Sequence, residues 1–133
     1  MNTFFQMLFI KRNQIKKSFL RFGNLVTCKW WDNIWLNEGF ATYYSYVGEN
    51  ATNPENEPMK RMLVEAVQYA MRLDSRSSFS YPILLDVESP QELEDRLFGI
   101  PYYKGAALIR MMDAFLTHKT FIRGVKNYLE RWY

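Results

Sequence analysis

The sequence predicts a mainly α-helical fold. Apolar side chains recur at i, i+3 and i+4 spacing through several stretches, which are bounded by capping residues, proline or glycine. The composition, 48% hydrophobic and 17% aromatic, supplies enough apolar mass for a core and excludes a disordered class. A chain of 133 residues is one domain or a piece of one. We therefore expect roughly five helices and at most a short piece of strand.

The most informative stretch runs from Lys29 to Tyr44, where tryptophans and other aromatic residues surround Glu38. Asp32 is a favourable N-cap residue, and no proline interrupts the residues that follow it. This pattern predicts a helix over 32–47 that is closed by Gly48.

Glu38 is an unusual residue for its place on this helix. It shares a stripe with Ile34 and Thr42, and a carboxylate among apolar side chains costs free energy unless a partner compensates it. Gly39, in mid-helix, costs roughly 1 kcal/mol relative to alanine. We expect another backbone to approach closely at this glycine. An alternative reading of the acid is a structural ion pair with a nearby lysine or arginine.

A polar loop is predicted from Gly48 to Pro58. Pro58 suits the first turn of a second helix, which is amphipathic and runs to about Leu73. The apolar positions of that helix are Met59, Met62, Leu63, Ala66, Val67 and Ala70. We expect its methionines to fill the core rather than to bind a ligand.

Residues 74–80 are predicted to form a polar loop, and 81–87 a short irregular or extended piece. Ser89, Pro90 and Glu92 then form a capping-box pattern that starts another helix. That helix is short, because a glycine and a proline follow it at positions 99 and 101.

Two helices are predicted in the last third of the chain. Residues 102–116 are apolar on nearly every side, which is typical of a helix buried in a larger assembly. The last helix begins at about His118 and presents one apolar face, formed by Phe121, Val125, Leu129 and Trp132. No stop signal follows it, so we expect the chain to end within a domain.

Four segments carry a resemblance to a known family: residues 22–27, 29–31, 35–43 and 102–106. Together they resemble the M1 family of zinc aminopeptidases, and in particular its aminopeptidase N (membrane alanyl aminopeptidase) branch. The resemblance implies that residues 22–133 are the helical part of a thermolysin-like (gluzincin) catalytic domain, truncated at both ends. It also implies an activity for the parent enzyme, the removal of N-terminal residues from peptides by zinc-activated water.

The resemblance implies roles for two residues. Glu38 matches the glutamate that is the third protein ligand of the catalytic zinc. Tyr102 matches the tyrosine of the family's Tyr-x-Lys-Gly motif, which hydrogen-bonds the oxyanion of the tetrahedral intermediate. A phenol, with an ordinary pKa of about 10, remains a neutral donor at pH 7. The alternative for Tyr102 is simple packing beside Pro101.

The family's His-Glu-x-x-His motif is missing. Its spacing from Glu38 places the two zinc-binding histidines at Ile15 and Phe19, and the general base at Lys16. One of three protein ligands for Zn²⁺ is therefore present, so we expect zinc binding by this chain to be impaired and peptidase activity to be absent. Residues that would bind substrate are not identified.

Two functions from different classes follow. The first is a fragment of an M1 zinc metalloaminopeptidase, inactive as written. The second is a non-catalytic helical module of the same family that acts by binding, for example to a full-length relative. In either case Trp30, Trp31, Trp35 and the face over 106–112 would be exposed, and exposed apolar patches promote aggregation.

Residues 1–21 match nothing in the family and are expected to be irregular. They contain five basic residues and no acid. The positive charges at Lys11 and Arg12 follow the apolar residues 4–10, whereas a signal peptide carries its positive charge before the apolar segment. A basic amphipathic helix is one alternative. Another is an intron read-through or a wrongly set start codon, which the genomic DNA upstream of Phe22 would reveal.

Charge and cysteine content limit the remaining possibilities. Outside the leader the chain has 12 basic and 14 acidic residues, so nucleic acid is not an expected partner. No apolar run is long enough for a membrane helix, although the resemblance suggests a cell-surface or extracellular parent.

Cys28, the only cysteine, cannot form an internal disulfide, and we expect it to have no role. We expect His118, the only histidine, to have a polar or capping role.

Overall fold

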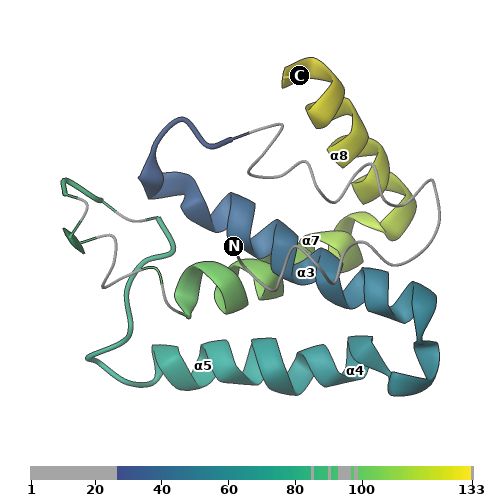
Figure 1. Ribbon diagram of the computed structural model, residues 1–133, viewed down its shortest axis with the longest axis horizontal. Helices are drawn as coiled ribbons and strands as arrows, with labels where there is room; N and C mark the ends of the chain where they lie inside the picture. Colours follow the sequence, from purple (N-terminus) through teal and green to yellow (C-terminus); the bar gives the residue numbers. More distant parts are fainter. Residues whose placement is uncertain (1–26, 85, 90, 93–96, 98, 133) are drawn as a thin grey trace.

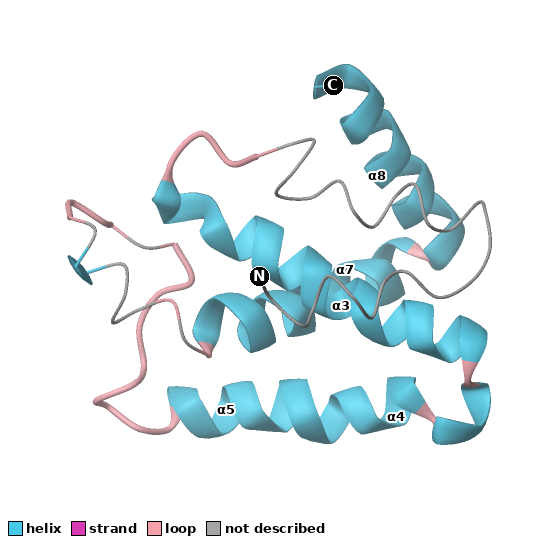
Figure 2. Cartoon of the chain, viewed as in Figure 1, coloured by secondary structure: helices cyan, strands magenta, loops and turns pink. Residues whose placement is uncertain are grey.

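The computed structural model describes residues 27–84, 86–89, 91–92, 97 and 99–132, and every regular element in these ranges is a helix (Figures 1 and 2). The elements are η1 (Trp31–Asn33), α3 (Ile34–Thr52), η2 (Pro54–Asn56), α4 (Pro58–Met62), η3 (Leu63–Gln68), α5 (Tyr69–Asp74), η4 (Ile100–Lys104), α7 (Gly105–Leu116) and α8 (His118–Trp132). The prediction of a mainly helical chain is confirmed.

Helix α3 is the central element, and α7 crosses it (Figure 1). The predicted boundaries of α3 are wrong at both ends. Asp32 lies inside the 3-10 turn η1 and accepts a hydrogen bond from Asn33 Nδ2 at 2.8 Å, so it does not cap the helix. At the other end the helix continues through Gly48 to Thr52, because one glycine within a helix costs only about 1 kcal/mol. Pro54, which lacks an N–H, lies just beyond the observed end.

The elements α4, η3 and α5 form one continuous rod along one side of α3 (Figure 1). It begins at Pro58, as predicted, because proline suits the first helical turn. Met62, Ala66 and Ala70 are buried against the core, as predicted, whereas Leu63, which was assigned to the same face, is exposed. The middle of the rod, η3, is a π-helix, a feature that apolar spacing did not predict.

A second continuous rod is formed by η4 and α7. It follows Gly99, whose φ of 91° lies in the region that favours glycine. Ala106 and Ile109 are fully buried, whereas Met111 and Phe115 are exposed. The 106–112 face, which was expected to be exposed, is therefore exposed at its two methionines and buried on the side of α7 that α3 covers.

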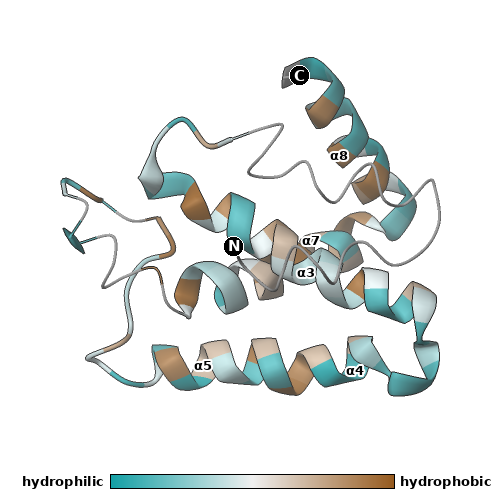
Figure 3. Cartoon of the chain, viewed as in Figure 1, coloured by the Kyte–Doolittle hydropathy of each residue, from teal (hydrophilic) through white to brown (hydrophobic). Residues whose placement is uncertain are grey.

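Helix α8 begins at His118, as predicted, and is strongly two-sided (Figure 3). Phe121 and Leu129 are buried, and Val125 packs against the core. The ring of Phe121 stacks on that of Phe40 from α3, with centroids 6.2 Å apart. The Trp132 side chain lies outside the described residues.

One apolar cluster joins these helices. Its buried members are Phe40, Tyr43, Tyr44, Met62, Ala66, Ala106, Ile109 and Phe121. They come from α3, from the α4–η3–α5 rod, from α7 and from α8. The core is therefore centred on α3, and residues on this helix are held from several sides.

The connection after α5 contains a turn at 75–79 and no regular element over the described residues 81–87. The backbone N–H of Glu92 donates to Ser89 Oγ at 3.3 Å, as a capping box requires. Most of the helix predicted to follow lies outside the described residues, and so does the leader 1–21. None of the described helices combines the length and the apolar content needed to cross a membrane.

Candidate active-site half at the crossing of α3 and α7

Two glycines form the crossing point of α3 and α7. A Cβ added to Gly39 would lie 2.8 Å from the carbonyl carbon of Gly105, and one added to Gly105 would lie 3.0 Å from Gly39 Cα. Such distances are shorter than any ordinary carbon contact, so both positions need glycine. The close backbone approach predicted at Gly39 is confirmed, and the partner is the first residue of α7.

The crossing brings Glu38 and Tyr102 together. Glu38 precedes Gly39 on α3, and Tyr102 lies three residues before Gly105 in the π-helical turn η4. The Tyr102 phenol lies close enough to the Glu38 carboxylate to act as a hydrogen-bond donor to it. Both side chains are half-buried. Within the part of the chain that the structure describes, Glu38 forms no ion pair with a lysine or arginine, so its partner is a neutral phenol.

The two groups shift each other's pKa. Burial raises the pKa of Glu38 above its usual value, and the hydrogen bond from Tyr102 partly opposes this rise. Burial, together with the negative charge of Glu38 and the hydrogen bond to it, raises the pKa of Tyr102 to about 12. Tyr102 therefore stays protonated at neutral pH and acts as a hydrogen-bond donor.

Two contacts with α5 hold the π-helical turn that carries Tyr102. Lys104 Nζ lies 2.7 Å from Asp74 Oδ2, which ties the turn to the end of α5. The ring of Tyr103 meets that of Tyr69 edge-on, with centroids 4.7 Å apart. Tyr103 thus faces α5 while Tyr102 faces Glu38, so the two adjacent phenols lie in different surroundings.

The donor set near Glu38 does not fit a zinc ion. Over the described ranges no three His, Cys, Asp or Glu side chains gather closely enough to hold a metal ion. The chain has one histidine, His118, and its Nδ1 contacts Asp113 at the junction of α7 and α8. A catalytic zinc site requires three protein ligands, commonly including imidazoles. The described residues therefore do not make up a zinc site by themselves.

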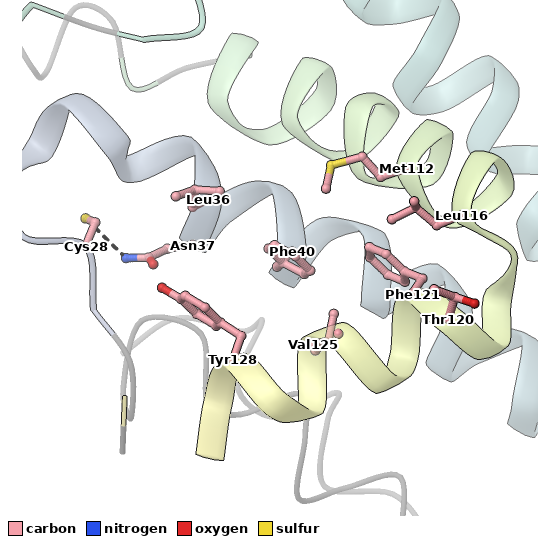
Figure 4. Close-up of a pocket in the computed structure, with 11 residues that line it drawn as sticks. Cys28, Leu36, Asn37, Phe40, Met112, Leu116, Thr120, Phe121, Val125 and Tyr128 are labelled. Carbon is pink, nitrogen blue, oxygen red and sulfur yellow. Dashed lines mark hydrogen bonds between the residues drawn. The ribbon is translucent and has the colours of Figure 1, made fainter. Parts of the chain in front are cut away.

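An apolar groove of about 380 Å³ lies between α8 and the α3–α7 pair (Figure 4). Phe121, Val125 and Tyr128 line it from α8, with Phe40 opposite them on α3. Its most polar end holds Cys28, whose sulfur accepts a hydrogen bond from Asn37 at 3.5 Å. Burial raises the pKa of this thiol, which favours the unreactive protonated form.

Asp113 is a polar centre that sequence reasoning missed. It is 8% exposed, and it accepts hydrogen bonds from Tyr43 and contacts His118. The available signal was a single acid in α7, a helix that is apolar apart from this residue and Arg110. His118 begins α8, as expected, but its ring pairs with this buried carboxylate.

The described part of the chain is thus a set of packed helices in which an acid and a phenol are paired at a helix crossing. The model of the peptidase family M1 domain matches residues 20–133. Aminopeptidase 2, mitochondrial, from Saccharomyces cerevisiae is 42% identical over 111 residues, which are 84% of this chain and 12% of the relative. Glutamyl aminopeptidase from Bitis rhinoceros is 38% identical over 112 residues, again 84% and 12%. The human glutamyl aminopeptidase is 37% identical over 111 residues, with the same coverage.

The chain belongs to peptidase family M1. It spans about an eighth of the length of the curated relatives that it matches. Zinc is implied by the family for the full enzyme.

Proposed function

We propose that this chain is a part of an M1 zinc aminopeptidase that contributes Glu38 as a metal ligand and Tyr102 as the oxyanion donor, and that it has no peptidase activity by itself. The parent reaction is the removal of N-terminal residues from peptides. The observation that carries the proposal is the pairing of Glu38 with Tyr102 at the Gly39–Gly105 crossing. Two residues from separate family segments, 64 positions apart in the chain, meet at one place.

The properties of the two side chains suit these roles. Glu38 is half-buried and has no cationic partner among the described residues, so its carboxylate is paired only weakly and remains able to bind a cation. Tyr102 is a neutral donor at pH 7, which an oxyanion requires. The chain has no pair of imidazoles to complete a zinc site, and no base in place of Lys16. These absences support the proposed lack of activity.

Exposed apolar side chains near α3 and on α7 support the proposal that further polypeptide of the parent enzyme packs against these helices. The side chains of Trp30 and Phe115 are 56% and 87% exposed. In the described part of the chain, the indole N–H of Trp35 is buried without a hydrogen-bond acceptor. An unsatisfied buried donor costs free energy, so an acceptor from additional polypeptide would stabilise it.

The test is an aminopeptidase assay of the purified full chain with an alanyl-chromophore substrate and added zinc. We expect turnover no higher than that of the Glu38→Ala variant. Turnover that exceeds this variant and is also lost in Tyr102→Phe would refute the proposed inactivity. Tyr103→Phe is the matched control, because its phenol lies on the same turn and faces α5.

A second candidate is a non-catalytic module that binds another protein, such as a full-length relative. The apolar groove between α3 and α8 is the observation that favours it. Light scattering of the purified chain distinguishes the binding module from the enzyme fragment. A monodisperse monomer that binds a full-length M1 enzyme favours the binding module, whereas concentration-dependent aggregation favours a fragment whose apolar surface is normally covered.

A further inference from the structure

The last two residues of α5 contact both ends of the π-helical turn η4, although no residue of α5 belongs to the candidate site. Before the turn, Leu73 packs on Gly99, where an added Cβ would lie 2.6 Å from Leu73 Cδ1. In the last residue of the turn, Lys104 Nζ lies 2.7 Å from Asp74 Oδ2. The end of α5 therefore grips a turn of five residues at its two ends.

The middle of the turn is held from the same side. The ring of Tyr103 meets that of Tyr69 edge-on, with centroids 4.7 Å apart. The guanidinium of Arg72 lies 5.8 Å from the centroid of Tyr69, and this cation–π contact restrains the ring against which Tyr103 packs. The backbone N–H of Tyr103 donates to the carbonyl of Gly99 at 2.9 Å, which closes the turn.

The carboxylate of Asp74 is fixed by contacts to both of its oxygens. Oδ2 meets Lys104, and Oδ1 accepts a hydrogen bond from Ser80 Oγ at 3.5 Å. The side chains of Asp74 and Lys104 are 34% and 29% exposed. A pair that solvent still reaches contributes little to overall stability, so its effect is to fix the direction of the Lys104 side chain.

The contact of the turn with α3 does not determine the direction of Tyr102. Gly105, which packs on Gly39, lies beyond the end of the turn and three residues after Tyr102. The direction of the phenol therefore depends on the contacts of the turn itself. Catalytic groups need such support from the residues around them, since a displacement of about 1 Å can cost about 100-fold in rate.

We propose that Asp74 is a positioning residue, whose ion pair with Lys104 holds η4 in the orientation that directs the Tyr102 phenol at Glu38. This inference rests on the proposed role of Tyr102 as the oxyanion donor. Asp74 acts through Lys104. Loss of the ion pair releases one end of the turn, and the phenol then spends less time beside Glu38.

NMR of the full chain, with tyrosine isotope-labelled at Cζ, tests the proposal at neutral pH. Tyr102→Phe assigns the Tyr102 signal, and Glu38→Gln shows where this signal lies when the phenol has no carboxylate beside it. Asp74→Lys sets two cations against each other, so we expect it to move the Tyr102 signal most of the way towards its position in Glu38→Gln. An unchanged Tyr102 signal would overturn the proposal.

The signals of the buried Tyr43 and Tyr44 distinguish a displaced turn from a general loss of structure. We expect both signals to stay in place in Asp74→Lys. If they moved together with the Tyr102 signal, Asp74 would support the fold as a whole, and its specific positioning role would be refuted.

A rescue variant and a charge control assign the effect to the ion pair. Asp74→Lys combined with Lys104→Glu restores opposite charges, and we expect it to return the Tyr102 signal towards its wild-type position. Glu130→Lys makes the same change of charge at the pair between Lys126 and Glu130 on α8, and should leave the signal unchanged. A failed rescue, or an equal shift in Glu130→Lys, would contradict the proposal.

The same spectra distinguish a failure of this proposal from a failure of the proposed function. If Glu38→Gln moves the Tyr102 signal and Asp74→Lys does not, only the positioning role of Asp74 is refuted. If Glu38→Gln leaves the signal unchanged, the phenol does not lie beside Glu38 in solution. The proposed function then loses the observation that carries it, and the role of Asp74 is refuted with it.

Discussion

Gly39 on α3 and Ile109 on α7 pack so closely that a Cβ built on Gly39 would lie 3.1 Å from Ile109 Cδ1. The same Cβ would meet the Gly105 backbone at 2.8 Å, and backbone cannot move aside as the end of a side chain can. The distance between α3 and α7 is therefore set by atoms that have little freedom, and the position of Tyr102 relative to Glu38 depends on it.

Gly39→Ala is expected to destabilise the chain by about 1–3 kcal/mol, because the added methyl forces the two helices apart. Urea unfolding measures this. Gly48→Ala is the matched control on the same helix: nothing lies within 4 Å of its added Cβ, so we expect a gain of about 0.5–1 kcal/mol from helix propensity. Equal effects at the two glycines would contradict the tight crossing.

Ile109→Ala should lower the free energy of unfolding by about 2–5 kcal/mol, because this side chain of α7 is fully buried against α3 and its removal leaves a cavity. Met111 lies two residues further along the same helix and is 62% exposed, so Met111→Ala should change stability by less than about 0.5 kcal/mol. Unfolding midpoints of both variants give the comparison. A large loss in Met111→Ala would mean that the exposed face of α7 is covered in solution.

Glu38→Gln is expected to stabilise the chain at pH 7. The pKa of Glu38 is raised by burial, so its ionised form opposes folding and the stability it contributes is lost as the pH rises through its folded value. Well below the ordinary pKa of a glutamate, at about pH 3, the wild type and the variant should converge. The difference between the urea midpoints of the wild type and the variant at each pH reports on Glu38 alone, because the other carboxylates contribute equally to both proteins. A variant that is less stable at pH 7 would show that the carboxylate has a favourable partner.

Tyr102→Phe should raise the pKa of Glu38 further, because it removes the hydrogen bond that lowers it. The carboxyl resonance of Glu38, followed by NMR as the pH changes, reports this shift directly. Tyr103→Phe removes a phenol from the same π-helical turn without touching Glu38 and should leave the titration unchanged. If both variants behaved alike, the hydrogen bond between Tyr102 and Glu38 would not exist in solution.

Local rules predicted most of the helices. Pro58 at a helix start, His118 at the start of α8 and the buried stripe that includes Met62 all follow from backbone restriction and apolar periodicity. The same rules misplaced both ends of α3, since Asp32 does not cap it and Gly48 does not end it. Capping and glycine preferences amount to about 1 kcal/mol, and packing of the helix against α7 and α4 readily exceeds that.

The candidate site was predicted in part. Glu38 and Tyr102 were identified by the family segments that contain them, and Gly39 by its cost in a helix. The sequence did not reveal that Tyr102 lies on a π-helical turn or that Asp74 holds that turn through Lys104. It also missed Asp113, because one acid in an apolar run gives no indication of which donors will reach it.

The sequence by itself determined the family, the helical class and the absence of the histidine pair, because each depends only on which residues occur and in what order. Only the tertiary structure decided that Glu38 meets Tyr102, that Gly39 meets Gly105, and that Tyr43 and His118 share Asp113. These pairings join residues from different helices, so they depend on the angle and distance at which the helices cross. That geometry results from the packing of all the core side chains together and cannot be read from any one segment.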